Sequence, residues 1–243
     1  FLKVMSNEAI CRRFLEKLLG ITVRELRFLQ TEKTVEQGIF SKGIRLDVYV
    51  EDDEGRMYDI EMQTTDRKED ALGLRTRYYQ SVLDQHTLEK GEDYITLRKT
   101  YIIFICTFDP FRQGRARYTF RSRCIEDLAL ELDDRATRIF LNATGLTNGP
   151  DVDMDANMDE DIAGFLYYIH TNTAEKGLAA QVAAEVRQLK ASRAVKEEYM
   201  TLAKEIRRQV LKERDALMAE GFAMGEASLP TVSILPLPKT IFD

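Results

Sequence analysis

The sequence has little of what a zinc protein, a disulfide-stabilised protein or a membrane protein requires. Its 243 residues include two histidines and three cysteines. Cys11, Cys106 and Cys124 lack metal-ligand spacing, which excludes a zinc cage. An odd number of cysteines without a disulfide framework favours a reducing compartment, so we expect a cytoplasmic protein. No apolar run approaches the roughly 20 residues that a membrane helix needs, so we expect no membrane partner.

Neither histidine stands in a motif that indicates catalysis. His86 falls near the end of a predicted helix, where a structural or capping role is more common, and His170 closes a second predicted helix. The sequence opens on Phe1 rather than on Met, so we expect the natural chain to begin upstream.

The charge distribution gives conflicting indications about a nucleic-acid partner. The net charge of −6 argues against one, because phosphate binding depends on Lys and Arg. Residues 112–123 nevertheless contain no acid and combine two aromatic residues with five arginines: Arg112, Arg115, Arg117, Arg121 and Arg123. A crowded acidic run follows at 151–161. Two interpretations of the arginines stay open, a solvated hairpin and contact with the DNA backbone.

Residues 44–63 carry the most informative pattern, two alternating strands around a tight turn. In the first strand Ile44, Leu46, Val48 and Val50 alternate with Arg45, Asp47, Tyr49 and Glu51; in the second Tyr58, Ile60 and Met62 alternate with Met57, Asp59, Glu61 and Gln63. Gly55 supplies the positive φ of the turn. One antiparallel register pairs Leu46 with Met62, Val48 with Ile60 and Val50 with Tyr58, and any one-residue slip breaks that apolar pairing.

The same register places Asp47 directly opposite Glu61. Like charges at opposite positions destabilise a sheet, unless a proton, a basic neighbour or a cation relieves them. Oxygen ligands on adjacent strands suit Mg²⁺, which binds one or two carboxylates and keeps waters for a substrate phosphate. The alternative is an exposed acidic hairpin face with Arg45 as its neutralising neighbour.

These residues resemble the signature of the PD-(D/E)XK nuclease superfamily, in which one acid, a hairpin turn and a second acidic motif, here Glu61-Met62-Gln63, follow one another. The resemblance is strongest to the transposase-associated branch, the recombination-promoting nucleases. The segment 1–5 resembles the opening helix of that branch, the Arg-x-Arg-Tyr-Tyr-Gln-Ser run at 75–81 resembles its helix after the hairpin, and the apolar strand within 94–108 fits as well. The resemblance covers about residues 1–150, with looser similarity beyond.

The resemblance implies a mixed α/β fold, an αβββαβ core with a C-terminal helical extension. It also implies a metal-dependent DNA endonuclease that hydrolyses phosphodiester bonds in association with transposition or recombination. Asp47, Glu61 and Gln63 would be the catalytic residues. Asp47, Glu61 and the carbonyl of Met62 would bind Mg²⁺, with Mn²⁺ or another divalent ion as alternatives.

One position departs from the superfamily pattern. Two residues after the second acid the pattern has Lys, which is thought to orient or deprotonate the attacking water, and this chain has Gln63. Gln cannot accept that proton, although it can position a water and resembles the norm for this branch. A metal-bound water would then supply the hydroxide unaided, because a bound cation lowers its pKa.

Double-stranded DNA is the partner that the resemblance implies. We expect it to contact five arginines: Arg75, Arg77, Arg115, Arg117 and Arg121. For Arg75 and Arg77 the alternative is a salt bridge to Asp47 or Glu61. A further acid from the first helix is a weaker candidate for the site. The sequence does not choose between Glu8 and Glu16 for this role.

A second hypothesis makes the chain a nuclease-derived module that binds DNA or a protein without cutting, because resemblance of fold does not secure activity. The substitution of Gln63 for Lys keeps this hypothesis open. Retention of Asp47, Glu61 and Gln63 together speaks against it. A weaker third hypothesis is an oligomerisation scaffold built on the C-terminal helix.

The remaining patterns predict the order of elements. Helices are predicted at 7–19, ended by Gly20, and from Asp66, which forms a capping box with Glu69, to about Lys90. Strands are predicted at 23–29, 100–108, 118–122 and 137–142, with the fully apolar 100–108 run buried in mid-sheet.

The C-terminal part is predicted to be helical. A linker at 142–157 precedes a short helix at 162–170 and a longer helical pattern from 174 to about 221. The apolar stripe of the longer pattern is explained by docking onto the core or by a coiled-coil partner, which would give a homo-oligomer. Three prolines after position 226 exclude further helix. We therefore predict a nuclease-like core at 1–150, a helical region at 151–225 and a disordered tail at 226–243.

Overall fold

The computed structural model describes residues 1–29, 34–35, 44–67, 71–88, 90–146 and 158–195, together with scattered helical positions between 197 and 214. The chain divides into two compact units, Phe1–Ala184 and Glu185–Asp243. The predicted tail at 226–243 and most of the predicted linker lie outside the described residues. The division into domains at 150 and 225 stays a prediction.

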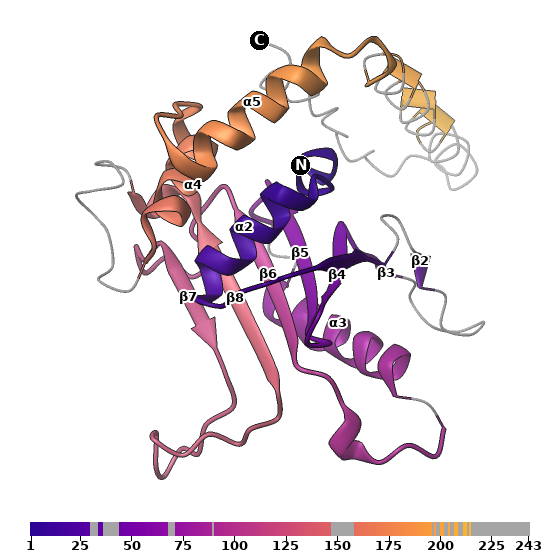
Figure 1. Cartoon of the computed structure of the whole chain (residues 1–243), viewed down its shortest axis with the longest axis vertical. Coiled ribbons are helices and arrows are strands. Elements are labelled where there is room, and N and C mark those ends of the chain that lie inside the picture. Colours follow the sequence, from indigo (N-terminus) through magenta and orange to yellow (C-terminus); the bar gives the residue numbers. More distant parts are fainter. Residues whose placement is uncertain are drawn as a thin grey trace, which may run out of the picture. The chain divides into compact units, whose positions relative to one another are not determined.

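The order of helices and strands along the chain confirms the predicted mixed α/β fold with an αβββαβ core. In chain order they are α1 (Leu2–Met5), α2 (Glu8–Leu19), β1 (Leu26–Phe28), β2 (Thr34–Val35), β3 (Ile44–Arg45), β4 (Val48–Asp52), β5 (Met57–Gln63), α3 (Leu72–Thr87), η2 (Tyr94–Thr96), β6 (Thr100–Cys106), β7 (Arg117–Phe120), β8 (Ala136–Asn142), η3 (Ala143–Leu146), α4 (Glu160–Thr171) and α5 (Gly177–Ala191) (Figure 1). Among the described helices, none combines the length and apolar character needed to cross a bilayer.

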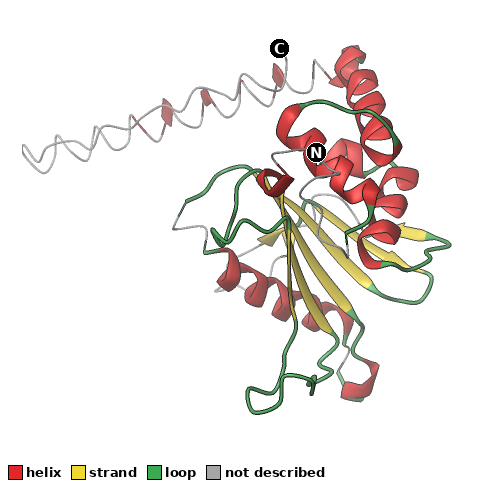
Figure 2. Cartoon of the chain, turned by 90° about the vertical axis from the view of Figure 1, so that its left-hand side faces the viewer, coloured by secondary structure: helices red, strands yellow, loops and turns green. Residues whose placement is uncertain are grey.

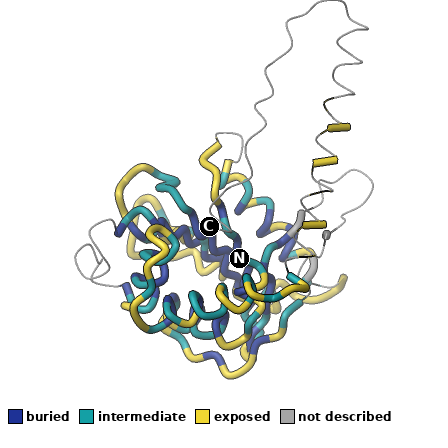
Figure 3. Tube along the Cα trace, turned by 90° about the horizontal axis from the view of Figure 1, so that it is seen from above, coloured by how far each residue is buried: buried dark blue, intermediate teal, exposed yellow. Residues whose placement is uncertain are grey.

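A six-stranded mixed sheet forms the centre of the first unit, in the order β1-β4-β5-β6-β8-β7. The pairs β5–β6 and β6–β8 are parallel, and the others are antiparallel. Helix α3 covers one face, while α2 and α4 cover the other (Figure 2). Figure 3 shows buried positions gathered in the interior of this arrangement. A strand covered on both faces has no solvated side, which explains why all of β6 is buried, as its apolar run predicts.

The hairpin forms in the predicted register, but its first strand is interrupted. Val48 pairs with Ile60 and Val50 with Tyr58, as predicted. Strand β4 starts only at Val48, whereas β3 pairs with β2 in a separate two-stranded sheet. The predicted pairing of Leu46 with Met62 is therefore wrong. Leu46 packs instead in the apolar cluster beneath α3, because the chain changes course between the two short strands.

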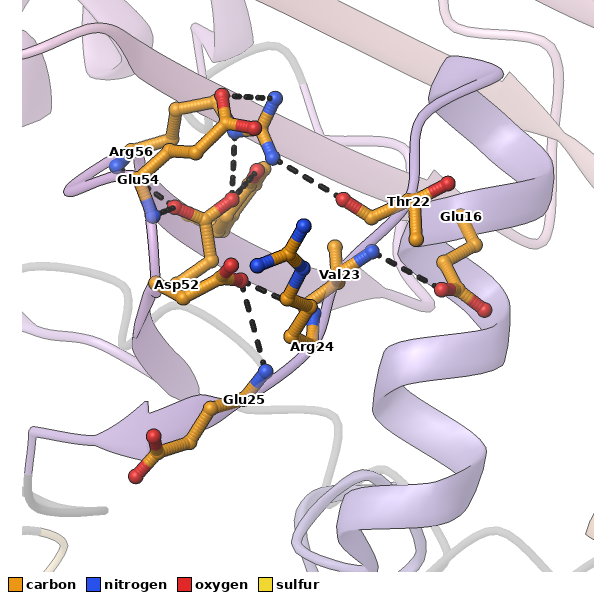
Figure 4. Close-up of polar contacts among 10 residues, drawn as sticks. Glu16, Thr22, Val23, Arg24, Glu25, Asp52, Glu54 and Arg56 are labelled. Carbon is orange, nitrogen blue, oxygen red and sulfur yellow. Dashed lines mark hydrogen bonds and ion pairs between the residues drawn. The ribbon is translucent and has the colours of Figure 1, made fainter.

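The turn of the hairpin is held by a buried carboxylate. Asp52 accepts hydrogen bonds from the guanidinium of Arg56 at 2.5 Å and from the hydroxyl of Tyr58 at 2.6 Å. Its other oxygen accepts the backbone N–H groups of Glu54 and Arg56. Gly55 has the predicted positive φ, 74°. Figure 4 shows that Arg56 also reaches the carbonyl of Thr22, which ties the turn to the segment before β1.

Helix α2 forms as predicted and carries the second layer. The side chain of Asn7 caps its start, and Gly20 ends it in the left-handed conformation with φ 65°. Phe14 packs edge-on against Phe165 of α4, with ring centroids 5.4 Å apart. The guanidinium of Arg13 binds the Asp161 carboxylate at 2.8 Å, so α2 and α4 form one layer.

Helix α3 starts later than the sequence indicates. The capping box predicted at Asp66 does not start it, because the helix begins at Leu72 after Ala71 in the left-handed conformation, φ 40°. Asp66 pairs with Arg112 at 3.4 Å instead, and Glu69 lies outside the described residues. The helix ends at Thr87, before the predicted stop. The buried side that includes Thr76, Tyr79 and Leu83 is as predicted.

The C-terminal helices differ from the single long pattern that was predicted. Helix α5 begins at Gly177 and the helical path is interrupted at Ser192. Within the second unit, Arg193 and Glu197 form an exposed ion pair at 2.8 Å, one helical turn apart. Such a pair stabilises a helix only weakly. The predicted oligomer of these helices stays a prediction.

Candidate functional site

Asp47 and Glu61 meet at the open end of the hairpin. Asp47 directly precedes β4, and its backbone N–H donates to the Glu61 carboxylate at 2.9 Å. In return, the backbone N–H of Met62 donates to the Asp47 carboxylate at 3.2 Å. Each acid is thus fixed by the main chain of the other strand. Glu61 is 4% exposed, whereas Asp47 is half-buried, so the pair lies at the margin of the core.

The carbonyl of Met62 faces the same place. In a strand the N–H and C=O of one residue point to the same side, and the N–H of Met62 points to Asp47. The neighbouring residue Gln63 uses its carbonyl on the other side, where it accepts from Thr107. The carbonyl of Met62 therefore lies on the edge of β5 that faces Asp47.

Arg75 of α3 contacts Glu61 from the helix that covers this face of the sheet. Its guanidinium donates to Glu61 at 3.2 Å, to the side-chain oxygen of Gln63 at 2.9 Å and to the hydroxyl of Tyr79 at 2.9 Å. It also lies over the ring of Phe104, 5.0 Å from the centroid. The salt bridge between Arg75 and Glu61 was one of the two interpretations that the sequence left open. The structure forms it.

Gln63 is held on both ends of its amide. Besides accepting from Arg75, it donates to the carbonyl of Thr65 at 3.0 Å and to the hydroxyl of Thr65 at 3.3 Å. It is 9% exposed. The amide of Gln63 therefore positions the guanidinium of Arg75 beside Glu61. The guanidinium carries a positive charge in the place where a Lys at position 63 would have carried one.

Burial and crowding favour the protonated form of the acids at this site. Burial and, after it, the charge of Asp47 raise the pKa of Glu61 to about 7, against the opposing effects of the Asp47 N–H and Arg75. The guanidinium of Arg75 therefore does not outweigh the combined effect of burial and the Asp47 charge on Glu61. An additional cation would be stabilised there.

Asp59 is a third acid that the sequence analysis placed on this face without giving it a role. It is fully buried, and within the described residues neither of its carboxylate oxygens has a partner in hydrogen-bond geometry. Burial raises its pKa well above the usual range, and the charges of Glu61 and Asp47 add to the effect. The signal was present in the sequence, because Asp59 stands two residues before Glu61 and strand alternation puts both side chains on one face.

The donor set fits a hard divalent ion. Mg²⁺ binds carboxylate and carbonyl oxygens and keeps several waters, so Asp47, Glu61 and the Met62 carbonyl suffice for it. The part of the chain that the structure describes holds no cluster of three His, Cys, Asp or Glu side chains able to bind a metal. The described residues therefore do not form a zinc site enclosed by protein ligands.

Comparison with known proteins identifies the family of the chain. Residues 2–219 match the PD-(D/E)XK nuclease family transposase model. The chain belongs to this family. The match extends beyond the 150 residues on which the resemblance was recognised and includes α4 and α5. No curated protein and no solved structure matches the chain.

In this PD-(D/E)XK family chain, most of the other arginines predicted to contact DNA bind groups other than Asp47 and Glu61. Arg117 donates to the carbonyl of Leu18, on the α2 face of the sheet. Arg121 pairs with Glu131, as does Arg123. The backbone of Arg115 contacts Tyr118 and Asn142. Arg77 is exposed on α3. The predicted arginines therefore do not all gather around Asp47 and Glu61.

Two weaker acid candidates are engaged in α2. Glu16 accepts the backbone N–H of Val23 at 2.9 Å and fixes the chain after the helix (Figure 4). Glu8 lies 3.9 Å from Arg12 in the first turn. A cavity of about 640 Å³ lies at the opposite end of the strands, where Arg56 and Arg98 are paired with Asp52 and Glu51. These pairings leave the Asp47–Glu61 pair as the candidate site.

Proposed function

We propose that this protein is a Mg²⁺-dependent endonuclease that hydrolyses phosphodiester bonds of double-stranded DNA, with a role in transposition or recombination. The observation that carries the proposal is the reciprocal pairing of Asp47 and Glu61 through each other's strands. Membership of the nuclease family supports it. Mn²⁺ is the alternative ion, because it accepts the same oxygen ligands.

The residues around Asp47 and Glu61 have different roles in this proposal. Asp47, Glu61 and the Met62 carbonyl would hold the ion. A bound divalent ion lowers the pKa of its water and neutralises charge on the phosphate. Their rigid hydrogen bonds fix the carboxylates before substrate arrives, which reduces the reorganisation needed for reaction.

Gln63 and Arg75 act together in this proposal. The earlier prediction that Gln63 positions the attacking water stays a prediction, and its contacts add the positioning of Arg75. A guanidinium can stabilise the negative charge that develops on a phosphate in the transition state. Arg75 therefore supplies a cation on the same side as the acids without taking up the proton of the water.

The second candidate function is DNA binding without cleavage. Arg75 already occupies one oxygen of Glu61 at 3.2 Å, and Gln63 stands where the superfamily pattern has Lys. If Arg75 keeps that oxygen when DNA is bound, Glu61 has one oxygen fewer for the ion. This candidate predicts DNA affinity that is independent of divalent ions.

Supercoiled plasmid distinguishes the two candidates. We expect the full chain to nick or linearise it with Mg²⁺ or Mn²⁺ and not with EDTA. Asp47→Asn should abolish cleavage, because it removes the charge and keeps an oxygen to accept from Met62. Glu54→Gln, which changes an exposed acid at the other end of the hairpin, is the matched control and should cleave normally. Tight DNA binding with no cleavage under any divalent ion would contradict the nuclease proposal.

A further inference from the structure

A second potential binding surface lies on the same face of the sheet as Glu61. It is an open groove of about 350 Å³ between α3 and strands β7 and β8, and we call it the aromatic groove. Its lining residues are Gly73, Thr76, Arg77, Phe111, Phe120, Arg138 and Phe140. The volume is at the lower end of the range of about 300–1,000 Å³ for small-molecule pockets, so it suits one or two ring systems.

The walls of the groove are aromatic rings set at steep angles. Phe111 contacts Phe140 and Phe120 with centroids 5.0 and 5.1 Å apart, and Phe120 contacts Phe140 at 5.8 Å. Phe120 is 43% exposed although the cluster is apolar. An exposed ring beside a preformed aromatic wall offers a flat surface on which another ring can stack.

Two arginines, Arg77 and Arg138, flank these rings. In the described part of the chain Arg77 forms no hydrogen bond or ion pair, and Arg138 forms no hydrogen bond. The charge of Arg138 acts on the Asp84 carboxylate. Flat rings with available guanidinium groups are the combination that binds single-stranded nucleic acid, since bases stack on the rings and phosphates pair with the cations.

The groove stands in register with the candidate site. Glu61 is paired with Phe104 on β6, and Phe104 is paired with Phe140 on β8. Phe140 is thus two strands from Glu61, about 10 Å at the usual strand spacing. Arg75 covers Phe104 midway. A stacked strand rises roughly 3.4 Å per nucleotide, so about three nucleotides span this distance.

We propose that the aromatic groove holds an unpaired base of the DNA strand whose phosphate lies at Asp47 and Glu61. This inference rests on the proposed nuclease function and narrows its substrate. A paired base has both faces stacked and its edge engaged, so only an unpaired base can enter. Taking a base out of a duplex costs energy that an already single-stranded base does not require. The substrate is therefore DNA with a single-stranded segment close to the cleavage point, such as a gap, fork or frayed end.

Binding without cleavage tests the groove separately from the chemistry. Affinities of the full chain are measured in EDTA by fluorescence anisotropy, with labelled oligothymidylate and with a duplex of equal length. We expect Phe120→Ala and Arg77→Gln each to weaken binding of the single strand about ten-fold, with the duplex affected less than about two-fold. Quenching of 2-aminopurine in a single strand, lost in Phe120→Ala, would show stacking directly.

Matched controls separate the groove from general effects of charge and aromatic content. Tyr94→Ala removes a ring that is 82% exposed in η2, before β6, and Arg27→Gln removes an exposed cation on β1. Neither should change either affinity. Arg77 is exposed and unpaired within the described residues, so Arg77→Gln stays folded even if Phe120→Ala is destabilised.

The failures of the two proposals differ. The groove proposal would be overturned by any of three results. The groove variants could lose affinity equally for both DNAs, they could lose no affinity, or the natural chain could fail to bind the single strand. If single strands bind as expected while no divalent ion supports cleavage, the proposal that the groove binds an unpaired base is supported and the nuclease proposal fails. If the protein cleaves gapped and continuous duplex equally and Phe120→Ala cleaves both normally, the groove fails and the nuclease proposal is upheld.

Discussion

Arg75 donates a hydrogen bond to the side-chain oxygen of Gln63 at 2.9 Å, and this contact links the one residue that departs from the superfamily pattern to α3. A Lys at position 63 would be beside a guanidinium, and two cations at that distance repel each other. Gln63 and Arg75 therefore form a matched pair, in which the helix provides the charge and the strand provides the acceptor.

The first prediction is that Gln63→Lys destabilises the protein. The change removes the acceptor for Arg75 and places a second cation in a largely buried position, so unfolding free energy should fall by roughly 1–3 kcal/mol. Urea denaturation of the variant, of Arg75→Gln and of the double variant checks this. In the double variant the new ammonium can pair with Glu61, so the two losses should not add. Strict additivity would show that the Gln63–Arg75 pair is not coupled.

The second prediction contrasts two buried acids of the same hairpin. Asp59 is fully buried and its pKa is raised well above the usual range, so Asp59→Asn should leave stability at pH 7.5 unchanged or raise it, because the folded chain no longer has to take up a proton there. Asp52 accepts from Arg56 and Tyr58, so Asp52→Asn should lower stability by about 2 kcal/mol or more. Denaturation midpoints of the two variants measure both effects. A loss in Asp59→Asn as large as that in Asp52→Asn would mean that Asp59 is ionised and paired.

The third prediction concerns the pH dependence of stability in EDTA. The pKa of Glu61 is about 7 in the folded chain and near its ordinary value of about 4.3 in the unfolded chain. The folded chain thus binds the extra proton, and this contribution to stability is complete below the unfolded pKa and is lost as pH rises through about 7. The loss is on the order of 3 kcal/mol. Unfolding curves at pH 5.0 and 7.5 should show a smaller decline for Glu61→Gln than for the natural chain. Equal declines would place the Glu61 pKa at its ordinary value.

The fourth prediction is metal-linked stabilisation. If Asp47 and Glu61 hold the ion, Mg²⁺ or Mn²⁺ at a hundred times the dissociation constant should stabilise the fold by about 2.7 kcal/mol. At one fixed ion concentration the effect should be larger at pH 8 than at pH 6, because the ion displaces the proton on Glu61. Thermal unfolding with and without metal measures it, and calorimetric titration gives the affinity. Asp47→Asn should lose the stabilisation and Glu54→Gln should keep it; an equal shift in both variants would place the ion elsewhere.

Hairpin register, the buried β6 and the mixed sheet could be predicted because they depend on strand alternation and on apolar runs. The start of α3 could not, since the helix begins after a left-handed Ala71 that no cap residue signals. The contact of Arg75 with Glu61 depends on how α3 is rotated on the sheet, and periodicity alone left its partner open. The aromatic groove was missed because Phe111, Phe120 and Arg138 come from three separate segments.

The carboxylate of Asp47 takes the place of a missing main-chain partner for Met62, where β4 has not yet begun. Natural selection would therefore keep an acid or amide at this position in a relative that had stopped cutting DNA, since losing it would fray the sheet. Conservation of Asp47 among relatives is for that reason a poor marker of activity. The more telling substitutions across the family are those between Asp and Asn, which spare the architecture and remove only the charge.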